Sequence, residues 1–278
     1  MTCRELVNKG AGILSVSGIE NAANEAEMLL CFLMGFSKTD YILNRALSID
    51  EVATASFMNL IDSRTKHVPL QYILHTAPFL GMDFTVGEGV LVPRPETEEL
   101  TQICIDRIRA KGYLNVIDLC SGSGCIGISI ARCCPQTEVW LLEKYDEAIA
   151  YLKRNVPCDV ASRVHIVQAD ILTYDPARLP MVHLIVSNPP YIPADDIGSL
   201  QAEVQMEPRT ALDGGKDGLI FYHNIASRWV SRICPGGCLA LECGETQTEA
   251  VAQMLHSAAK KEIVFDMFGL QRFVIVEY

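Results

Sequence analysis

The segment Ser187–Pro193 (SNPPYIP) places one amide side chain before two prolines and an aromatic ring, directly after an apolar run. Proline offers a carbonyl but no N–H and holds φ at about −65°. The segment is therefore stiff and rich in hydrogen-bond acceptors. A ligand suited to such a surface brings its own N–H groups.

A planar –NH2 group is such a ligand, and it is a poor nucleophile because its lone pair is delocalised. Two acceptors on its two N–H bonds can hold it in line with an electrophilic methyl group and stabilise the charge that develops. We expect the Asn188 oxygen and the Pro189 carbonyl to be these acceptors, with Tyr191 against the flat face of the group. The simpler alternative is a turn that ends a strand.

A second motif lies upstream, in the segment VIDLCSGSGCIG. Gly122, Gly124 and Gly127 match the spacing of a dinucleotide-binding loop between a strand and a helix. A nucleoside can approach the backbone closely there, beside the free N–H groups of the helix start. The loop alone is a weak signal.

Glu143 strengthens that signal, because it ends the next apolar run, nineteen residues after Gly124. A carboxylate at the end of the second strand can accept both hydroxyl hydrogens of a ribose. The two features together predict an adenosine-containing ligand. An ordinary strand–helix turn with an exposed glutamate is the alternative.

Both NAD and S-adenosylmethionine carry an adenosine. The sulfonium of S-adenosylmethionine favours acidic and carbonyl surroundings, and Asp118 before the loop and Asp170 after the third strand fit this ligand better than a pyrophosphate. We expect Asp170 and Ile171 to frame the adenine.

These motifs must be positioned by a sheet. From Tyr113 onward apolar runs alternate with helical stretches, which predicts a mostly parallel sheet with helices on both faces. The last two β-runs, joined through Gly269, are expected to form an antiparallel pair at one edge. The predicted strands are YLNVIDL, EVWLLE, RVHIVQ, HLIVS and CLALEC.

The first part of the chain does not show this alternation of strands and helices. Residues 24–35 and 49–66 are expected to be helical, and "PRPETEEL" to open a further helix with acidic residues in its first turn. Between them, 79–86 and 89–92 are predicted to pair as a hairpin around Gly87-Glu88-Gly89. We therefore expect a helical substrate-recognition domain at 1–74, a β-hairpin linker at 75–92 and a catalytic domain at 93–278.

Composition describes a globular protein of 278 residues with 49% hydrophobic residues and a net charge of −11. Such acidity disfavours a phosphate backbone as the partner, so no direct nucleic-acid binding is expected. The eleven cysteines, an odd number, and the absence of a signal-peptide pattern or a spanning run predict free thiols in the cytoplasm, away from any membrane. The spacing of Cys234, Cys238 and Cys243 favours core packing over a metal site.

The motifs together resemble the bacterial peptide chain release factor glutamine methyltransferases, a family of class I S-adenosylmethionine-dependent enzymes. The similarity runs in order along nearly the whole chain. The segments that carry it are EAEMLLCFLMG, PLQYIL, LVPRPETEEL, VIDLCSGSGCIG, IVSNPPYIP, EVQMEPRTALDGGKDGL and PGGCLALECGETQ.

The resemblance implies a Rossmann-like catalytic domain that methylates the glutamine amide in the Gly-Gly-Gln loop of release factors, leaving S-adenosylhomocysteine and using no metal. It implies that the segment Pro93–Thr97 lines the substrate pocket, and we expect a monomer. The implied substrate residues are Asn188, Pro189, Pro190 and Tyr191, of which Asn188, Pro189 and Tyr191 are the catalytic ones. The implied cofactor residues are Cys120, Ser121, Gly122, Ser123, Gly124, Glu143, Asp170, Ile171 and Asn188.

Three positions depart from the pattern of this family. Cys120 replaces the first loop glycine and would need a negative φ to be tolerated. Glu143 replaces the commoner aspartate, and Ile171 stands where an aromatic residue is frequent. These departures bear on cofactor affinity rather than on the reaction.

Other functions share parts of this pattern. A sister family methylates a ribosomal-protein glutamine but tends to differ at "PRPETE", which is intact here through Glu98. Methylation of an amino group on a nucleic-acid base uses the same Asn-Pro-Pro-Tyr. An NAD-dependent oxidoreductase would explain only the glycine spacing, and a non-enzymatic binding module would need none of these features together.

Overall fold

A computed structural model describes residues 1–278, and they form two compact units. The helical unit comprises Met1–Thr76 together with the inserted segment Gln201–Met206. The sheet unit comprises Ala77–Leu200 and Glu207–Tyr278. Our division into domains at 1–74, 75–92 and 93–278 stays a proposal. No helix combines the length and apolar composition that a membrane span requires.

The helical unit is built from amphipathic helices with defined ends. Thr2 and Glu5 form a reciprocal capping box at its first helix, and Gly35 in the left-handed conformation ends its second. Leu6, Leu29 and Phe57 are fully buried in its core. The helices predicted at 24–35 and 49–66 are confirmed. The helices are α1 (Cys3–Val16), α2 (Ala22–Met34), α3 (Lys38–Leu43), α4 (Glu51–Thr65), α5 (Leu70–Leu74) and α9 (Ala202–Gln205).

The hairpin exists, but its predicted pairing is wrong. Strand β1 (Thr76–Phe79) pairs with β2 (Met82–Thr85) in a two-stranded sheet. The turn is Leu80-Gly81, with φ of 47° and 72°. Two positive φ values are characteristic of the turn whose twist matches a two-residue hairpin. The glycines that we took for the turn lie beyond β2, in the segment 87–89, which forms no strand.

The sheet unit contains a seven-stranded sheet in the order β5-β4-β3-β6-β7-β9-β8. Strands β3 to β7 run parallel, and β9 is antiparallel to both of its neighbours. The predicted fold class is confirmed, including the antiparallel pair at the edge. The strands are β3 (Asn115–Leu119), β4 (Glu138–Glu143), β5 (Val164–Gln168), β6 (Val182–Ser187), β7 (Ile233–Glu242), β8 (Lys260–Phe265) and β9 (Gln271–Glu277).

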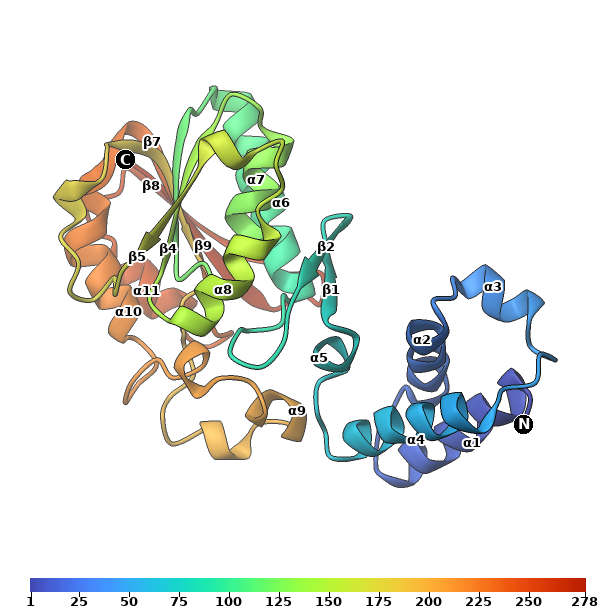
Figure 1. The fold of residues 1–278 in the computed structure, drawn as a ribbon. Helices are drawn as coiled ribbons and strands as arrows, with labels where there is room; N and C mark the ends of the chain where they lie inside the picture. Colours follow the sequence, from blue (N-terminus) through green and yellow to red (C-terminus); the bar gives the residue numbers. More distant parts are fainter. The chain divides into compact units, whose positions relative to one another are not determined.

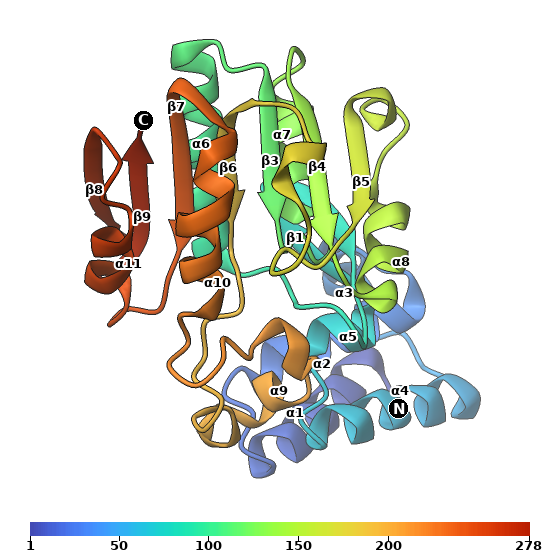
Figure 2. The same cartoon turned by 90° about the vertical axis from the view of Figure 1, so that its left-hand side faces the viewer.

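Helices cover both faces of this sheet (Figures 1 and 2). One face packs on α6 (Pro95–Lys111), α7 (Cys125–Cys133) and α8 (Asp146–Asn155). The other packs on α10 (Ile220–Asn224), its π-helical continuation Ile225–Trp229 and α11 (Thr248–Met254). The central strands are apolar on both faces because both faces are buried.

The strand order reverses between β3 and β6, which are hydrogen-bonded neighbours. In doubly wound sheets the crevice at such a switch point holds the ligand. Leu119, the last residue of β3, pairs with Ser187, the last residue of β6. The sheet register therefore places Cys120 and Asn188 next to each other, just beyond the strand ends.

Candidate active site

A cavity of about 380 Å³ lies in the sheet unit at the carboxyl ends of β3, β4, β5 and β6. Four segments that are distant in sequence line it: Cys120–Ser123, Leu142–Tyr145, Ala169–Leu172 and the pair Asn188 and Pro190. The remaining sides are lined by residues 89–91, Pro93, Arg94, Thr97, residues 208–211, Asp213 and Phe221. The fold thus brings the glycine loop, the acidic strand end and the Asn-Pro-Pro segment to one cavity.

The glycine loop carries backbone strain at its first position. Cys120 has φ of 59°, and Gly122 and Gly124 have φ of 54° and 83°. The negative φ that would let this position tolerate a side chain without strain is absent, because Cys120 keeps the left-handed conformation for which glycine is suited. A side chain there costs about 1–2 kcal/mol. The loop continues directly into α7, of which Gly124 is the N-cap.

Asp118 lies behind the loop rather than in the cavity wall. Its carboxyl is fully buried, and its Oδ2 accepts the backbone N–H of Gly127 at 3.0 Å. Burial raises the pKa of Asp118 to about 8. Because Asp118 does not line the cavity, it is not the acidic neighbour of a sulfonium that we expected. It holds the start of α7 instead.

Glu143 binds the turn that follows β4. Its Oε1 accepts the N–H groups of Lys144 and Tyr145 at 2.7 and 3.0 Å, and its Oε2 accepts that of Gly122 at 2.9 Å. A carboxylate offers about four acceptor positions, so three are in use. Glu143 therefore ties the glycine loop to the end of β4 and keeps one position for a further donor.

Asp170 and Ile171 line the cavity after β5. Asp170 forms an ion pair with Lys144, at 3.0 Å between Oδ2 and Nζ, and its hydrogen bond raises the pKa of that lysine. Its Oδ1 accepts the N–H of Leu172 at 2.9 Å. Ile171 is almost completely buried, and its carbonyl accepts the indole N–H of Trp229 at 3.1 Å.

Asn188 and Pro190 line the cavity, whereas Pro189 and Tyr191 do not. The Asn188 side chain donates from Nδ2 to the hydroxyl of Thr97 at 3.0 Å. Thr97 lies in the first turn of α6, within the segment Pro93–Thr97 that we expected in this pocket. Of that segment, Pro93, Arg94 and Thr97 line the cavity.

The segment after Pro190 is held by a glutamine and a glycine. The side-chain amide of Gln247 donates to the carbonyl of Tyr191 at 2.9 Å. Gly218 has φ of 74°, and a Cβ there would lie 2.2 Å from the Tyr191 carbonyl oxygen. Burial raises the pKa of the Tyr191 phenol. Only glycine at 218 permits this approach of the two loops.

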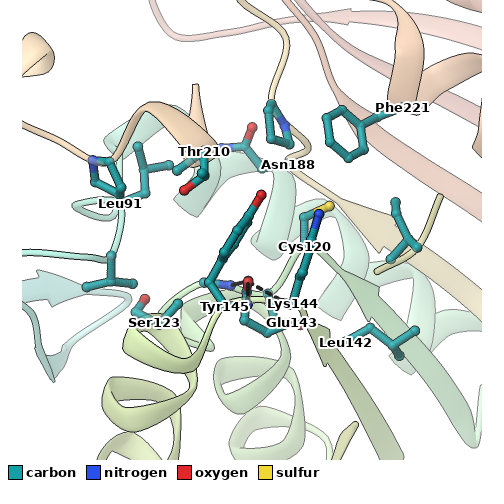
Figure 3. Close-up of a pocket in the computed structure, with 18 of the residues that line it drawn as sticks. Leu91, Cys120, Ser123, Leu142, Glu143, Lys144, Tyr145, Asn188, Thr210 and Phe221 are labelled. Carbon is teal, nitrogen blue, oxygen red and sulfur yellow. Dashed lines mark hydrogen bonds between the residues drawn. The ribbon is translucent and has the colours of Figure 1, made fainter. Parts of the chain in front are cut away.

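Several cavity residues escaped the sequence analysis. Figure 3 shows Asn188, Phe221 and Thr210 at one end of the cavity and Glu143 and Ser123 at the other, with the hydroxyl of Tyr145 directed toward the first group. Tyr145 could have been found by extending the strand-end signal two residues past Glu143. Phe221 and Thr210 have no comparable local signal, since they lie in two short helical segments far along the chain, α10 and the 3-10 turn Arg209–Ala211.

Two known family models match parts of this chain. Residues 5–74 match the family described as PrmC N-terminal domain, and residues 93–212 match the methyltransferase small domain. Among solved structures, the hMettl16 catalytic domain in complex with MAT2A 3'UTR hairpin 1 has a TM-score of 0.55 and 12% identity, over 89% of this chain and 90% of that one. This likeness establishes the fold alone.

Curated relatives match over nearly their full length. The release factor glutamine methyltransferase of Clostridium botulinum is 34% identical over 99% of this chain and 98% of its own. That of Geobacter sulfurreducens is 38% identical over 91% of this chain and 88% of its own. The chain belongs to the family of release factor glutamine methyltransferases.

Proposed function

We propose that this chain transfers a methyl group from S-adenosylmethionine to the side-chain amide nitrogen of the glutamine in the Gly-Gly-Gln loop of peptide chain release factors. The observation that carries the proposal is the register of β3 with β6, where Leu119 pairs with Ser187. It brings a nucleoside-type loop and an acceptor-rich Asn-Pro-Pro segment to the same cavity. Membership of the family supplies the class of substrate.

The proposed cofactor end of the cavity is lined by Cys120–Ser123, Glu143, Asp170 and Ile171, and Gly124 follows directly as the N-cap of α7. A volume of about 380 Å³ suits a ligand of nucleoside size. The remaining acceptor position on Glu143 suits one ribose hydroxyl, and the buried Ile171 offers an apolar wall for the adenine. A second ribose hydroxyl on Glu143 would have to displace the N–H of Gly122.

The proposed substrate end consists of Asn188 and Pro190, which line the cavity, and of Pro189 between them in the backbone. The Asn188–Pro189 and Pro189–Pro190 peptides have no N–H, so this backbone presents carbonyls only. Asn188 Oδ1 and the Pro189 carbonyl accept the two N–H groups of the substrate amide and hold its nitrogen toward the cofactor end. Contact of Tyr191 with the flat face of the amide stays a prediction, because Phe221 rather than Tyr191 lines the cavity.

The methyl transfer needs no dedicated general acid or base. When bound, S-adenosylmethionine supplies a methyl group on a sulfonium sulfur and leaves as S-adenosylhomocysteine. Asn188 and Pro189 orient the amide nitrogen for in-line attack and stabilise the positive charge that develops on it. The new N–C bond makes the nitrogen acidic, so one proton passes to water without a dedicated base.

The alternatives are not favoured. Family membership excludes the NAD-dependent oxidoreductase suggested by the glycine spacing alone. A ribosomal-protein glutamine and a nucleic-acid base remain chemically compatible with Asn188, but the curated relatives that span this chain are named for release factors. Monomeric, cytoplasmic action without nucleic-acid binding stays a prediction.

A labelled-methyl assay tests the proposal. Purified chain, tritiated S-adenosylmethionine and each candidate release factor are incubated side by side, and protein-bound tritium is counted. We expect one label per factor molecule at saturation. The matched control is the same factor with its loop glutamine replaced by alanine, which should stay unlabelled. Persistent labelling of that control, or labelling of ribosomal protein or RNA in place of the factor, would overturn the assignment.

A further inference from the structure

The amide of Asn188 is the end of a buried hydrogen-bond chain. Its Nδ2 donates to Thr97 Oγ1 at 3.0 Å, and the Thr97 hydroxyl donates to Glu242 Oε2 at 2.7 Å. Glu242 is the last residue of β7 and lies 145 positions from Thr97 in the sequence. Thr97 is 2% exposed and Glu242 is 1% exposed, so water does not compete for these bonds.

We propose that Thr97 and Glu242 are positioning residues. They fix which end of the Asn188 amide, the oxygen or the –NH2, is turned toward the substrate. This inference rests on the proposed function, because it concerns the orientation of the acceptor used in amide methylation. Neither residue has to touch the reacting atoms for this purpose. Both act through Asn188.

The direction of the chain follows from counting protons. An ionised carboxylate can only accept, and a threonine hydroxyl has a single hydrogen. Once that hydrogen is directed to Glu242, Thr97 can offer Asn188 only a lone pair. Asn188 must therefore turn its –NH2 toward Thr97, which leaves Oδ1 as the atom available to the cavity.

The opposite orientation of the Asn188 amide would prevent the reaction. A flipped Asn188 would present N–H groups to a substrate amide that itself needs acceptors on its N–H bonds. The flip would also bring Oδ1 to Thr97, whose hydrogen is already committed to Glu242, and leave two oxygens facing each other without a proton. Nothing in an isolated asparagine prefers one orientation so strongly, because the two ends of the amide have the same shape.

The charge state of Glu242 controls this preference. Burial raises the pKa of Glu242 to about 7, while the Thr97 hydroxyl and the cation of Arg272 on β9 lower it. At the start of α6, Glu96 raises this pKa and Arg94 lowers it. The other titratable groups that interact with Glu242 are Cys125, Tyr191, Tyr222 and Cys243, whose own pKa values burial raises.

The sign of the pH dependence follows. The ionised form of Glu242, which can only accept hydrogen bonds, predominates above a pH of about 7 and is lost as the pH falls through that value. A protonated Glu242 can donate to Thr97, which frees the Thr97 hydrogen for Asn188 Oδ1 and allows the flipped amide. Turnover should therefore decline on the acid side of this pKa.

The first test compares two threonines on α6. Thr97→Val removes the hydroxyl at nearly constant shape and should lower kcat about 10- to 100-fold, with the Kd for S-adenosylhomocysteine changed less than about twofold. Thr97→Ser restores the hydroxyl and should recover at least about a third of the turnover. Thr101→Val is the matched control, because Thr101 is equally buried but donates only to the Thr97 carbonyl. Wild-type kcat in Thr97→Val would overturn the proposal.

The second test changes the carboxylate. Glu242→Gln can donate to Thr97 at every pH, so its kcat should be low throughout and should lack the acid limb that the wild type shows near pH 7. An unchanged limb in Glu242→Gln would assign it to another group and overturn the role of Glu242. A loss of stability alone would lower the amount of folded enzyme without removing the limb.

A third readout separates this inference from the proposed function. The side-chain –NH2 of Asn188 is observed by 15N NMR without any substrate, and its hydrogen exchange is measured after assignment with Asn188→Asp. Exchange should be about tenfold faster in Thr97→Val and unchanged in Thr101→Val. If this holds while the wild type fails to label a release factor, the orientation stands and the proposed function fails. Equal exchange in all three proteins would overturn the orientation.

Discussion

At the scale of single residues, the proposed chemistry depends on one acceptor, Oδ1 of Asn188. Its amide is anchored through Nδ2 to Thr97, so the oxygen is the end that remains for a ligand. In the proposed arrangement the glycine loop and Glu143 bind the nucleoside without it. Binding of the cofactor and transfer of the methyl group should thus respond separately to changes at 188.

Asn188→Ala removes the acceptor and leaves the glycine loop intact. Removal of one oxyanion-hole donor typically costs about 10²–10³ in kcat, and we take this as the scale for an acceptor aimed at a developing positive charge. We expect a loss of this size in release factor methylation, with the Kd for S-adenosylhomocysteine within about threefold of wild type by calorimetry. Normal turnover in Asn188→Ala would show that the two-acceptor account is wrong.

Cys120 tests the strain in the loop. Because φ is 59° there, a β-branched side chain should clash with the backbone. Cys120→Val is expected to lower the free energy of unfolding by about 2 kcal/mol, whereas Cys120→Gly should stay within about 1 kcal/mol of wild type. Chemical denaturation measures both. Equal stability of the two variants would argue against a left-handed Cys120.

At the scale of elements, one side chain of α8 joins the hairpin to the glycine loop. Asn155 Oδ1 accepts the N–H of Thr85 at 2.7 Å, and its Nδ2 donates to the carbonyls of Thr85 and Ser123 at 3.0 Å each. The backbone N–H and carbonyl of a strand normally bond a neighbouring strand. At Thr85 of β2 the side chain of Asn155 takes both of these hydrogen bonds instead. The position of the loop is therefore coupled to that of the hairpin.

Asn155→Ala should break this connection. The loss of three hydrogen bonds, with partly buried partners, should cost about 2 kcal/mol of unfolding free energy. We also expect several-fold weaker binding of S-adenosylhomocysteine, because Ser123 lines the cavity. Lys153→Ala, an exposed change on the same helix, is the control and should alter neither quantity. Unaltered cofactor affinity in Asn155→Ala would mean that the loop holds its shape alone.

At the scale of the whole molecule, the inserted segment Gln201–Met206 packs with the helical unit although its neighbours in sequence belong to the sheet unit. Arg64 explains this assignment. Its guanidinium is 1% exposed and binds Glu25 from α2, at 2.5 Å between Nε and Oε2, and Glu203 from the inserted segment. No residue of α9 is buried, and the ion pair between Glu203 and Arg64 links this segment to α4.

Arg64→Met should leave Glu25 and Glu203 without their cation. Breaking a buried pair costs about 3–5 kcal/mol, and less here because Glu203 is 40% exposed, so we expect about 2–3 kcal/mol. The loss should appear in one of the two transitions that a chain of two units can show on denaturation. The KM for the release factor should rise more than the Kd for S-adenosylhomocysteine.

Lys66→Met is the control for Arg64→Met. Its ion pair with Asp62 lies on the same helix, with both side chains more than 60% exposed at 68% and 63%. Exposed pairs of this kind contribute about 0–1 kcal/mol. An Arg64→Met variant as stable as Lys66→Met would show that the inserted segment is held by other contacts.

The sequence by itself determined the order of the elements and which segments meet at the cavity. Apolar runs, capping residues and glycines are local properties of the chain, so the five predicted parallel strands and the acidic start of α6 could be recognised without a structure. The parallel strands also predicted that the glycine loop, Glu143 and Asn188 meet at one edge of the sheet. That edge is where the cavity lies.

Only the tertiary structure decided how these residues are held. The hairpin turns at Leu80-Gly81, whose positive φ values match the twist of the flanking strands, and Cys120 has a positive φ in the loop that joins β3 to α7. Thr97 meets Glu242 across 145 positions, and Arg64 meets Glu203 across 139. Such contacts depend on how distant elements pack, which no local pattern records.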